Sequence, residues 1–329
     1  MSQRQAERPA GRFAREKTFR TRTSERTRRM ASAPSMTGQP RRLDHLVLPV
    51  ESLDASRRRM EAMGFTVAAD AQHPFGTENA CVFLADGTYL EPLAIASRED
   101  CEAAARAGNV FVARDQAFRF RRGPEGLSAL VVSSEDAQAD DRRFHAAGIS
   151  AGAPLDFSRI MRLPDGSEGT GSFRLAFAAD LRAPDMFFFA CQRLQSLPSD
   201  RTALERHANG VTGIARVVLT EDNPSDFQYL LQEIFMQRHV AAQSFGMDLE
   251  AANAAVSVLT PEAVQAFFGE AGRLEGERGL RGFAVVFRVA SRAQLEDTLR
   301  AGDVAFRSLG PLIIVPPASG QGVLFAFGE

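Results

Sequence analysis

Two histidines and a glutamate in the first third of the chain are the residues best suited to carry chemistry. His45 lies in the run LDHLVLPV, His73 begins the run HPFGTEN, and Glu91 lies in the run DGTYLEPLA. An imidazole and a carboxylate that converge on a cavity can bind a divalent metal or transfer a proton. A histidine on a strand is more often a packed core residue, however, and a glutamate is more often solvated. The pattern alone therefore leaves both interpretations open.

Strand alternation predicts which way His45 and Glu91 point. On the strand that begins at Leu43, His45 falls on the face opposite Leu46 and Leu48, which we expect to pack against the following helix. His45 then faces the other side of the sheet, where a curled sheet forms a concavity. Glu91 alternates in phase with Tyr89 on a later strand. If the two strands lie near each other, His45 and Glu91 meet.

The HPFGTEN run is the second feature that could bind a ligand. Pro74 and Gly76 restrict its backbone, and His73, Thr77 and Asn79 add polar groups close to the start of a strand. A rigid polar loop at the mouth of a cavity suits ligand recognition. Alternatively, the Thr77 and Asn79 side chains hydrogen-bond to the loop's own backbone.

Arg216 is the candidate in the second half of the chain. An arginine that points inward from a strand can hold a carboxylate or a phosphate, although it can equally be paired within the fold. The remaining histidines, His145, His207 and His239, lie in charged or turn-forming segments and are weaker candidates.

The elements that must position these residues recur along the chain. The first set is a strand over 43–50, a helix capped by Ser52 and stopped at Gly64, and two strands around the turn Ala85-Asp86-Gly87. The same order is predicted from positions 127, 214 and 283, at spacings of about 70 to 85 residues, which is typical of duplicated units. In the third copy, alternation does not separate strand from helix over 249–258.

Four such βαβββ modules predict an α+β fold. Each module exposes one sheet face and needs a partner to cover it, so the modules should pair into two domains with curved mixed sheets around a cavity. We expect these domains at 43–195 and 210–329, with a polar linker over 196–209.

The first module resembles a known family. The combination of LDHLVLPV, a helix, HPFGTENACVFL and DGTYLEPLA is similar to a glyoxalase-like domain of the vicinal oxygen chelate superfamily. The resemblance is most specific over 43–95 and extends through the repeat pattern to 329. It implies paired βαβββ modules and one divalent metal ion held by His45 and Glu91. The alternative role for Glu91 is that of a general base.

The ligand set implied by this resemblance is incomplete. The superfamily takes two further ligands from the partner module, but here the equivalent places fall on Ser128 or Ala129 and on Phe189, Ala190 or Cys191. Stable metal sites use three or four protein ligands, so His73 is the candidate to complete this one.

The resemblance implies that the chain binds a small oxygenated organic molecule. The first hypothesis is a metal-dependent enzyme of the lyase, isomerase or dioxygenase type, in which the metal acts as a Lewis acid. The alternative is a metal-free small-molecule-binding or drug-sequestering protein of the same fold, which the missing ligands favour. Modules of this superfamily pair within one chain or between chains, so a homodimer stays open.

Residues 1–42 differ in composition from the rest. They carry 12 basic and 3 acidic side chains, or +9, so a total of −2 leaves −11 for the remainder. With few large apolar residues, this leader is expected to be disordered. It could bind nucleic acid, acidic lipid or an acidic protein, serve as a transit peptide, or precede the true start at Met30 or Met36. Composition favours the last, so we expect no nucleic-acid partner.

Composition also limits the setting of the protein. The sequence contains no apolar run long enough for a transmembrane helix and no apolar core of a secretory signal, so we expect no membrane association. The three cysteines form no CxxC pair, which argues against a disulfide framework. A reducing cytoplasm is the expected location.

Overall fold

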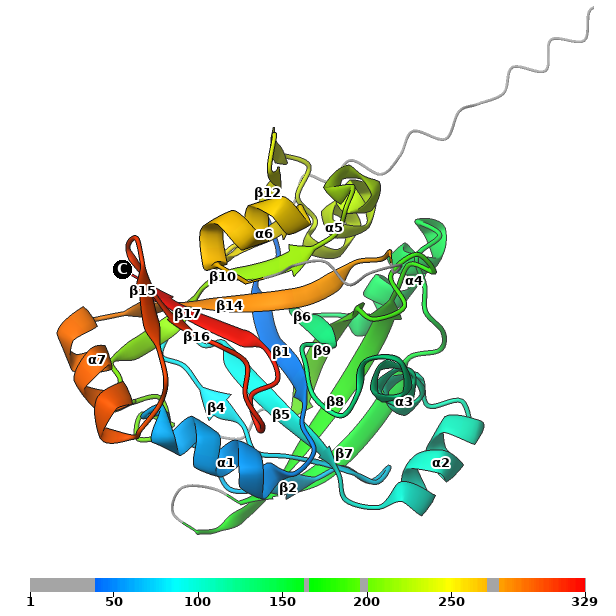
Figure 1. The fold of residues 1–329 in the computed structure, drawn as a ribbon. Helices are drawn as coiled ribbons and strands as arrows, with labels where there is room; N and C mark the ends of the chain where they lie inside the picture. Colours follow the sequence, from blue (N-terminus) through cyan, green and yellow to red (C-terminus); the bar gives the residue numbers. More distant parts are fainter. Residues whose placement is uncertain (1–38, 163–165, 196–200, 271–277, 329) are drawn as a thin grey trace, which may run out of the picture. The chain divides into compact units, whose positions relative to one another are not determined.

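Two mixed β-sheets form the framework of the protein (Figure 1). The computed structural model describes residues 39–162, 166–195, 201–270 and 278–328. Within these ranges one sheet has nine strands and the other has eight, and each contains two βαβββ modules side by side. The predicted α+β fold of four modules paired two by two is therefore confirmed.

The first module has the predicted order of elements: β1 (Leu43–Pro49), α1 (Leu53–Ala62), β2 (Ala71–Gln72), β3 (Thr77–Asn79), β4 (Val82–Phe83) and β5 (Tyr89–Ile95). Ser52 caps α1, because its hydroxyl oxygen accepts a hydrogen bond from the Ala55 amide at 3.1 Å. Gly64 follows the helix with φ +83°, the left-handed conformation that ends many helices.

The second module joins the first within one sheet. It comprises β6 (Ala129–Ser134), α4 (Ala137–Ala146), β7 (Leu155–Arg162), β8 (Glu168–Ala178) and β9 (Phe187–Gln195). Strand β1 lies at the centre, parallel to β5 and antiparallel to β6, while β6 is parallel to β9. The sequence of pairings in the first module is thus repeated in the second.

The third and fourth modules form the second sheet in the same way. The third consists of β10 (Val211–Thr220), a 3-10 helix (Pro224–Phe227), α5 (Gln228–Phe235), β11 (Ala241–Gln243), β12 (Gly246–Glu250) and β13 (Ala255–Leu259). The fourth consists of β14 (Arg281–Val289), α7 (Arg292–Ala301), β15 (Arg307–Leu309), β16 (Leu312–Val315) and β17 (Leu324–Gly328). The ambiguous stretch 249–258 therefore belongs to strands and their connection.

Three helices that the repeat pattern did not predict cover the outer faces of the sheets. Helices α2 (Arg98–Arg106) and α3 (Val110–Arg122) lie between the first two modules, and α6 (Pro261–Phe268) lies between the last two. Phe111 and Val112 of α3 pack on the face of the first sheet that carries Val47. Val264 and Phe268 of α6 pack on the second sheet.

The opposite faces of the two sheets contribute to one hydrophobic core. This core also takes in side chains of the crossing helices α1, α4, α5 and α7. Phe65 from the first module lies 5.5 Å from Phe287 on β14, measured between ring centroids, and Phe287 lies 5.0 Å from Phe325 on β17. The described residues of both sheets accordingly cluster into a single compact unit, in which the two paired sheets depend on each other.

Parts of the predicted leader and linker are anchored to this unit. Residues 1–38 and 196–200 lie outside the described residues. The Arg41 amide donates to the Phe235 carbonyl at 2.8 Å, and the Arg41 guanidinium pairs with Asp140. His207 of the predicted linker is buried. Its Nδ1 accepts a hydrogen bond from the Thr66 amide at 3.0 Å, and its Nε2 donates one to the Phe83 carbonyl at 2.9 Å.

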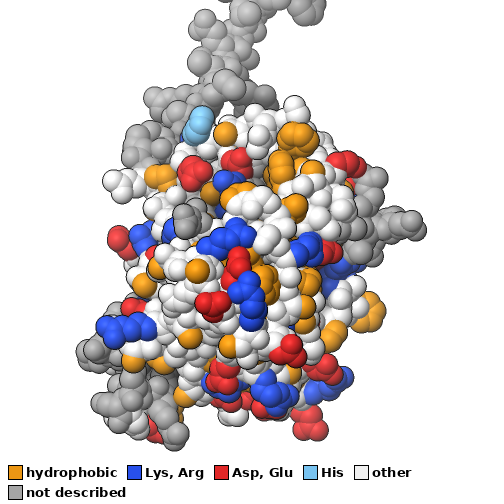
Figure 2. Space-filling view, turned by 60° about the vertical axis from the view of Figure 1, so that its left-hand side comes forward, with side chains coloured by type: hydrophobic (Ala, Val, Ile, Leu, Met, Phe, Trp, Pro, Cys, Tyr) orange, Lys and Arg blue, Asp and Glu red, His pale blue; other side chains and the backbone are white. Residues whose placement is uncertain are grey.

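The surface carries charges of both signs. On the face drawn in Figure 2, basic and acidic side chains are interspersed. Many such charges form short-range pairs, for example Arg300 with Glu296 at 2.7 Å, and exposed pairs of this kind add little stability. None of the helices in the described ranges has the length and apolar character needed to cross a membrane.

The shared core predicts that one substitution destabilises both sheets together. Phe287 is fully buried, so Phe287→Ala should lower the free energy of unfolding by about 3–5 kcal/mol in urea titrations. The exposed Phe267, replaced in the same way, should change it by less than about 1 kcal/mol. Separate unfolding transitions for the two sheets of Phe287→Ala would contradict a common core.

Candidate functional site

His45 and Glu91 meet on the outer face of the first sheet, as strand alternation predicted. In the parallel pairing of β1 with β5, His45 lies opposite Tyr89 and Val47 lies opposite Glu91. The Nε2 of His45 is 3.2 Å from Oε2 of Glu91, and the His45 ring stacks on Tyr89 with centroids 4.3 Å apart. His45 and Glu91 are both buried, so the contact is shielded from water.

Asp44 holds the other nitrogen of His45. Its Oδ1 lies 2.7 Å from Nδ1 of His45, although neighbouring residues on a regular strand point to opposite faces. The register between β1 and β6 shifts between Leu43 and His45, and such a bulge re-aims side chains. Arg193 on β9 then pairs with both oxygens of Asp44, at 2.7 and 2.9 Å. Asp44 and Arg193 were missed in the sequence, because simple alternation places Asp44 on the wrong face.

The HPFGTEN loop brings His73 to the same place. The His73 amide donates to the Thr77 carbonyl at 2.8 Å, and Nδ1 of His73 lies 2.9 Å from the Thr77 hydroxyl. These bonds leave Nε2 of His73 facing Glu91, 3.7 Å from Oε1. Thr77 therefore orients a site residue, and it bonds within the loop through the His73 ring.

Asn79 connects Glu91 to an arginine of the second module. The Asn79 amide nitrogen donates to Oε1 of Glu91, and its carbonyl oxygen accepts from Nη1 of Arg159 on β7 at 2.9 Å. The Asn79 side chain is thus directed into the site and does not bond to the backbone of its loop. Arg159 lies 80 residues further along the chain, and no local pattern marked it.

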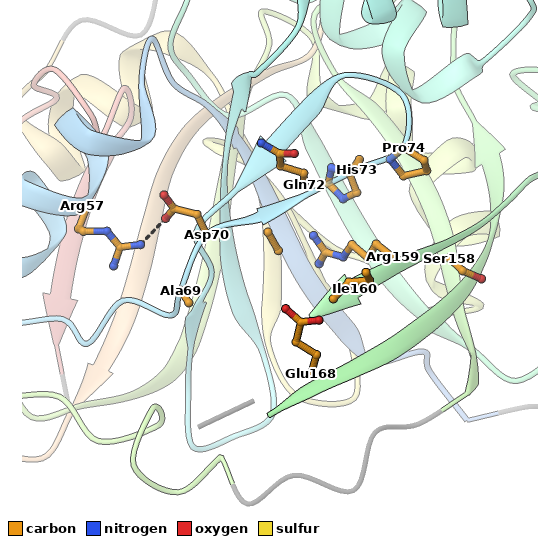
Figure 3. A pocket seen from close by; sticks show the side chains of 11 residues that line it. Arg57, Ala69, Asp70, Gln72, His73, Pro74, Ser158, Arg159, Ile160 and Glu168 are labelled. Atoms are coloured by element: carbon orange, nitrogen blue, oxygen red, sulfur yellow. Dashed lines mark hydrogen bonds and ion pairs between the residues drawn. The ribbon is translucent and has the colours of Figure 1, made fainter. Parts of the chain in front are cut away.

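These residues line two adjoining cavities. A small buried cavity of about 30 Å³ is lined by aromatic rings together with His45, His73, Glu91 and Arg159. A wide groove of about 780 Å³ lies outside it and is lined by both sheet modules, including Gln72. His73 and Arg159 line both spaces, and Figure 3 shows them projecting into the groove. The small cavity has room for a water molecule, whereas the groove has the size of a small-molecule site.

The buried charges set the protonation states of the site. Burial acts to lower the pKa of His45, but hydrogen bonds to Asp44 and Glu91 outweigh it and raise the pKa above 6.5. Burial acts to raise the pKa of Glu91, but its contact with His45 lowers that pKa to about 2. The pair therefore consists of an imidazolium and a carboxylate at pH values below the raised pKa of His45. Burial and the nearby Arg159 lower the pKa of His73 to about 3, which keeps that ring neutral.

The donor types suit a metal, but their placement does not complete a site. The Nε2 atoms of His45 and His73 both face Glu91, while Asp44 and Thr77 hold the two Nδ1 atoms, as second-shell partners of metal ligands do. However, Glu91 is already engaged by His45 and Asn79. Among the described residues, no three His, Cys, Asp or Glu side chains are grouped so that they could hold a metal ion.

The second module supplies no ligand at the equivalent positions. In the pairing of β6 with β9, Ala129 lies opposite Phe187 and Val131 lies opposite Phe189. By comparison with β1 and β5, Ala129 takes the place of His45 and Phe189 takes the place of Glu91. The second module therefore offers the methyl group of Ala129 and the phenyl ring of Phe189 where the first module offers an imidazole and a carboxylate, and neither group can bind a metal.

Arg216 lies apart from this site, on β10 of the second sheet. Its guanidinium donates to Asp248 at 2.5 Å and also to the Ser257 hydroxyl. It lines neither the buried cavity nor the groove. The structure therefore pairs Arg216 within the fold and does not bring it to the residues of the first module.

Comparison with known families identifies the fold. A sequence model described as "Glyoxalase-like domain" matches residues 43–235, which is more than half of the chain. The chain belongs to this glyoxalase-like family. The assignment confirms the resemblance to the vicinal oxygen chelate superfamily that the runs around His45, His73 and Glu91 implied.

Solved structures share the fold of this glyoxalase-like protein at low sequence identity. A hypothetical protein from Staphylococcus aureus has 12% identity and a TM-score of 0.60, over 87% of this chain and 98% of that one. A mutant of 4-hydroxymandelate synthase from Streptomyces coelicolor has 13% identity and a TM-score of 0.54, over 88% and 92%. These similarities show the fold alone. No curated protein matches the sequence.

The buried His45–Glu91 pair predicts how stability varies with pH. Because the folded pKa of His45 is raised, its contribution is present below pH 6.5 and is lost as the pH rises through the raised value. Because the pKa of Glu91 is lowered to about 2, its contribution is present above pH 4.5 and is lost as the pH falls through about 2. His45→Gln should therefore cost most between pH 4.5 and 6.5, by about 3–5 kcal/mol in urea titrations. A cost that is the same at every pH would contradict this.

The HPFGTEN loop predicts a second effect on stability. Gly76 has φ +90°, and an added Cβ would lie 2.6 Å from the Ser97 carbonyl oxygen and 2.8 Å from the Cys101 nitrogen. Gly108 has nearly the same φ, +92°, but open space around it. In thermal unfolding, Gly76→Ala should destabilise by about 2 kcal/mol more than Gly108→Ala, since only the first adds a backbone clash to the strain. Equal effects would mean that the contact with α2 does not constrain the loop.

Proposed function

We propose that this glyoxalase-like protein binds a small oxygenated organic molecule in the groove and transfers a proton to and from it. The observation that supports this most is the junction of the groove with the cavity at His73 and Arg159. Behind that junction lies the buried His45–Glu91 pair. A ligand oxygen placed in the small cavity would come within reach of both.

The His45–Glu91 pair acts as one unit in this proposal. The pair carries one proton, whose loss is coupled between the two groups. His45 has the raised pKa, so it is the group suited to donate that proton to a ligand oxygen and to take it back. Glu91, with its pKa near 2, keeps His45 charged and oriented, and it serves as a base only when His45 is neutral or displaced.

A metal-assisted form of the same reaction is the second candidate. It is favoured by the two Nε2 atoms that face Glu91, each on a ring whose Nδ1 is held from behind. In that form His45, His73 and Glu91 would have to shift, because as they lie in the described structure no three such side chains are placed to hold a metal ion. A divalent ion held after such a shift would supply Lewis-acid polarisation of the ligand oxygens. Asp44 and Thr77 would keep the two rings oriented. The metal-free binding protein without turnover remains the third outcome of the experiments below.

Proton transfer can be measured by solvent exchange. In D2O, wild-type protein should catalyse exchange at the carbon beside the carbonyl of a panel of α-hydroxy ketones and α-oxo acids, followed by proton NMR. Protonation of the carbonyl oxygen by His45 makes the neighbouring C–H acidic, and water removes that proton to give the enol. The enol returns its O–H proton to His45 as the carbon takes up deuterium from the solvent. His45→Gln and Glu91→Gln should each lower the rate about 10²–10⁴-fold, because each removes one half of the pair. Binding without exchange in the wild-type protein would leave a binding protein and refute the proposed chemistry.

Metal content separates the first two candidates. Elemental analysis of wild-type and His45→Ala protein, before and after loading with Mn²⁺, Zn²⁺ or Fe²⁺, should show no stoichiometric metal if the pair works alone. Stoichiometric metal that is lost in His45→Ala, together with exchange that requires it, would establish the metal-assisted form. His145→Ala is the matched control, because His145 is exposed on α4, where it contacts Asp141 and Ser150.

A further inference from the structure

We infer that the ligand of the groove is an organic acid and that its carboxylate pairs with Arg159. The inference rests on the proposed function in placing the ligand in the groove, and it names the chemical class of that ligand. The evidence for it is the environment of Arg159, which lies on β7 of the second module and outside the sequence runs that contain His45, His73 and Glu91.

Arg159 is placed at the junction of the groove and the buried cavity. It lies on β7 opposite Gly171 on β8, so no side chain of its cross-strand neighbour covers it. Its Nη1 is fixed by the Asn79 carbonyl oxygen at 2.9 Å, and its guanidinium lies 5.8 Å from the centroid of the Phe173 ring. Figure 3 shows the guanidinium projecting among the groove residues near His73. The head group is therefore held in place from two sides.

The guanidinium of Arg159 still has bonding capacity. Its Nε is buried and has no hydrogen-bond partner, and within the described ranges no carboxylate lies within 4.0 Å of its nitrogens. The other arginine of the groove, Arg57, is already paired with Asp70. Arg193, on the far side of His45, is paired with Asp44. Arg159 lines the groove, so a carboxylate in the groove that contacts its guanidinium would form charge-assisted hydrogen bonds with it.

The charge around Arg159 suits a carboxylate better than a phosphate. The Asn79 amide bonds to both Glu91 and Arg159 and so lies between this carboxylate and the guanidinium. Glu168 also lines the groove, and its negative charge disfavours a doubly charged ligand more than a singly charged one. A phosphate, with a charge of about −1.5 to −2, would need a further cation that Arg57 cannot supply while it is paired with Asp70.

The size of the two spaces fixes how such an acid would lie. The buried cavity of about 30 Å³ cannot hold an organic ligand, so the body of the acid lies in the groove of about 780 Å³. With its carboxylate on Arg159, the adjacent carbon and its oxygen substituent fall beside His73 and towards Glu91. An acid with an oxygen substituent on the carbon beside its carboxylate could therefore pair with Arg159 and also present that oxygen to the His45–Glu91 pair.

Matched acids and amides test this inference by isothermal titration calorimetry. The probes are pyruvate with pyruvamide and benzoate with benzamide, and inorganic phosphate is a separate arm. The acids should bind wild-type protein about tenfold or more tightly than their amides, because only the acids carry the charge. Arg159→Met should remove this advantage and leave the amides unchanged. Arg159→Lys, which keeps the charge without the fork, should retain part of it. Arg216→Met is the matched control and should leave the acid preference intact, because Arg216 lines neither the groove nor the buried cavity.

Several results would overturn the inference. They are equal binding of acids and amides, no binding of either acid, an acid preference that survives in Arg159→Met, and phosphate that binds as tightly as the acids. His45→Gln separates this test from that of the proposed chemistry. An acid preference that persists in folded His45→Gln and disappears in Arg159→Met supports the inference even where proton exchange is not observed.

Discussion

The first sheet depends on an imidazole buried between two carboxylates. His45 could not remain charged in an apolar interior alone, since burial of an isolated charge is very unfavourable. Asp44 and Glu91 supply the two acceptors that it needs, and Arg193 balances the charge of Asp44. Each member therefore requires the others. The surroundings of the His45 ring accordingly come from three features of the sheet. The bulge in β1 places Asp44, the register of β1 on β5 places Glu91, and the pairing of β9 with β6 places Arg193.

Much of the fold was predictable from local sequence signals. Ser52 marked the start of α1, and the Asp86-Gly87 turn marked the strands that become β4 and β5. The spacing of similar strands then revealed four modules. The three helices that cover the outer sheet faces were not predicted, because they are insertions between modules and have no counterpart in the repeat.

The candidate site was predictable only where its residues lie on one module. His45 and Glu91 follow from strand alternation, and His73 and Asn79 follow from the composition of their loop. Asp44 was hidden by a backbone irregularity that composition does not reveal. Arg159 and Arg193 come from strands of the second module, and their arrival at the site depends on the antiparallel pairing of β1 with β6. The sequence singled out Arg216 as a ligand-binding candidate for a related reason. Its pairing with Asp248 on β12 of the second sheet could not be predicted from the residues around it.

The contact between the HPFGTEN loop and helix α2 has a consequence for the energetics of binding. The Gly76 carbonyl accepts from the amides of Ala96 and Ser97 at 2.9 Å each, directly before α2. The loop that carries His73 is thus ordered by the same contacts that start the helix. Its conformational entropy is lost when the chain folds, so the association of a ligand does not have to order it again. The start of helix α2 thereby preorganises the loop that carries His73 for the ligand proposed above.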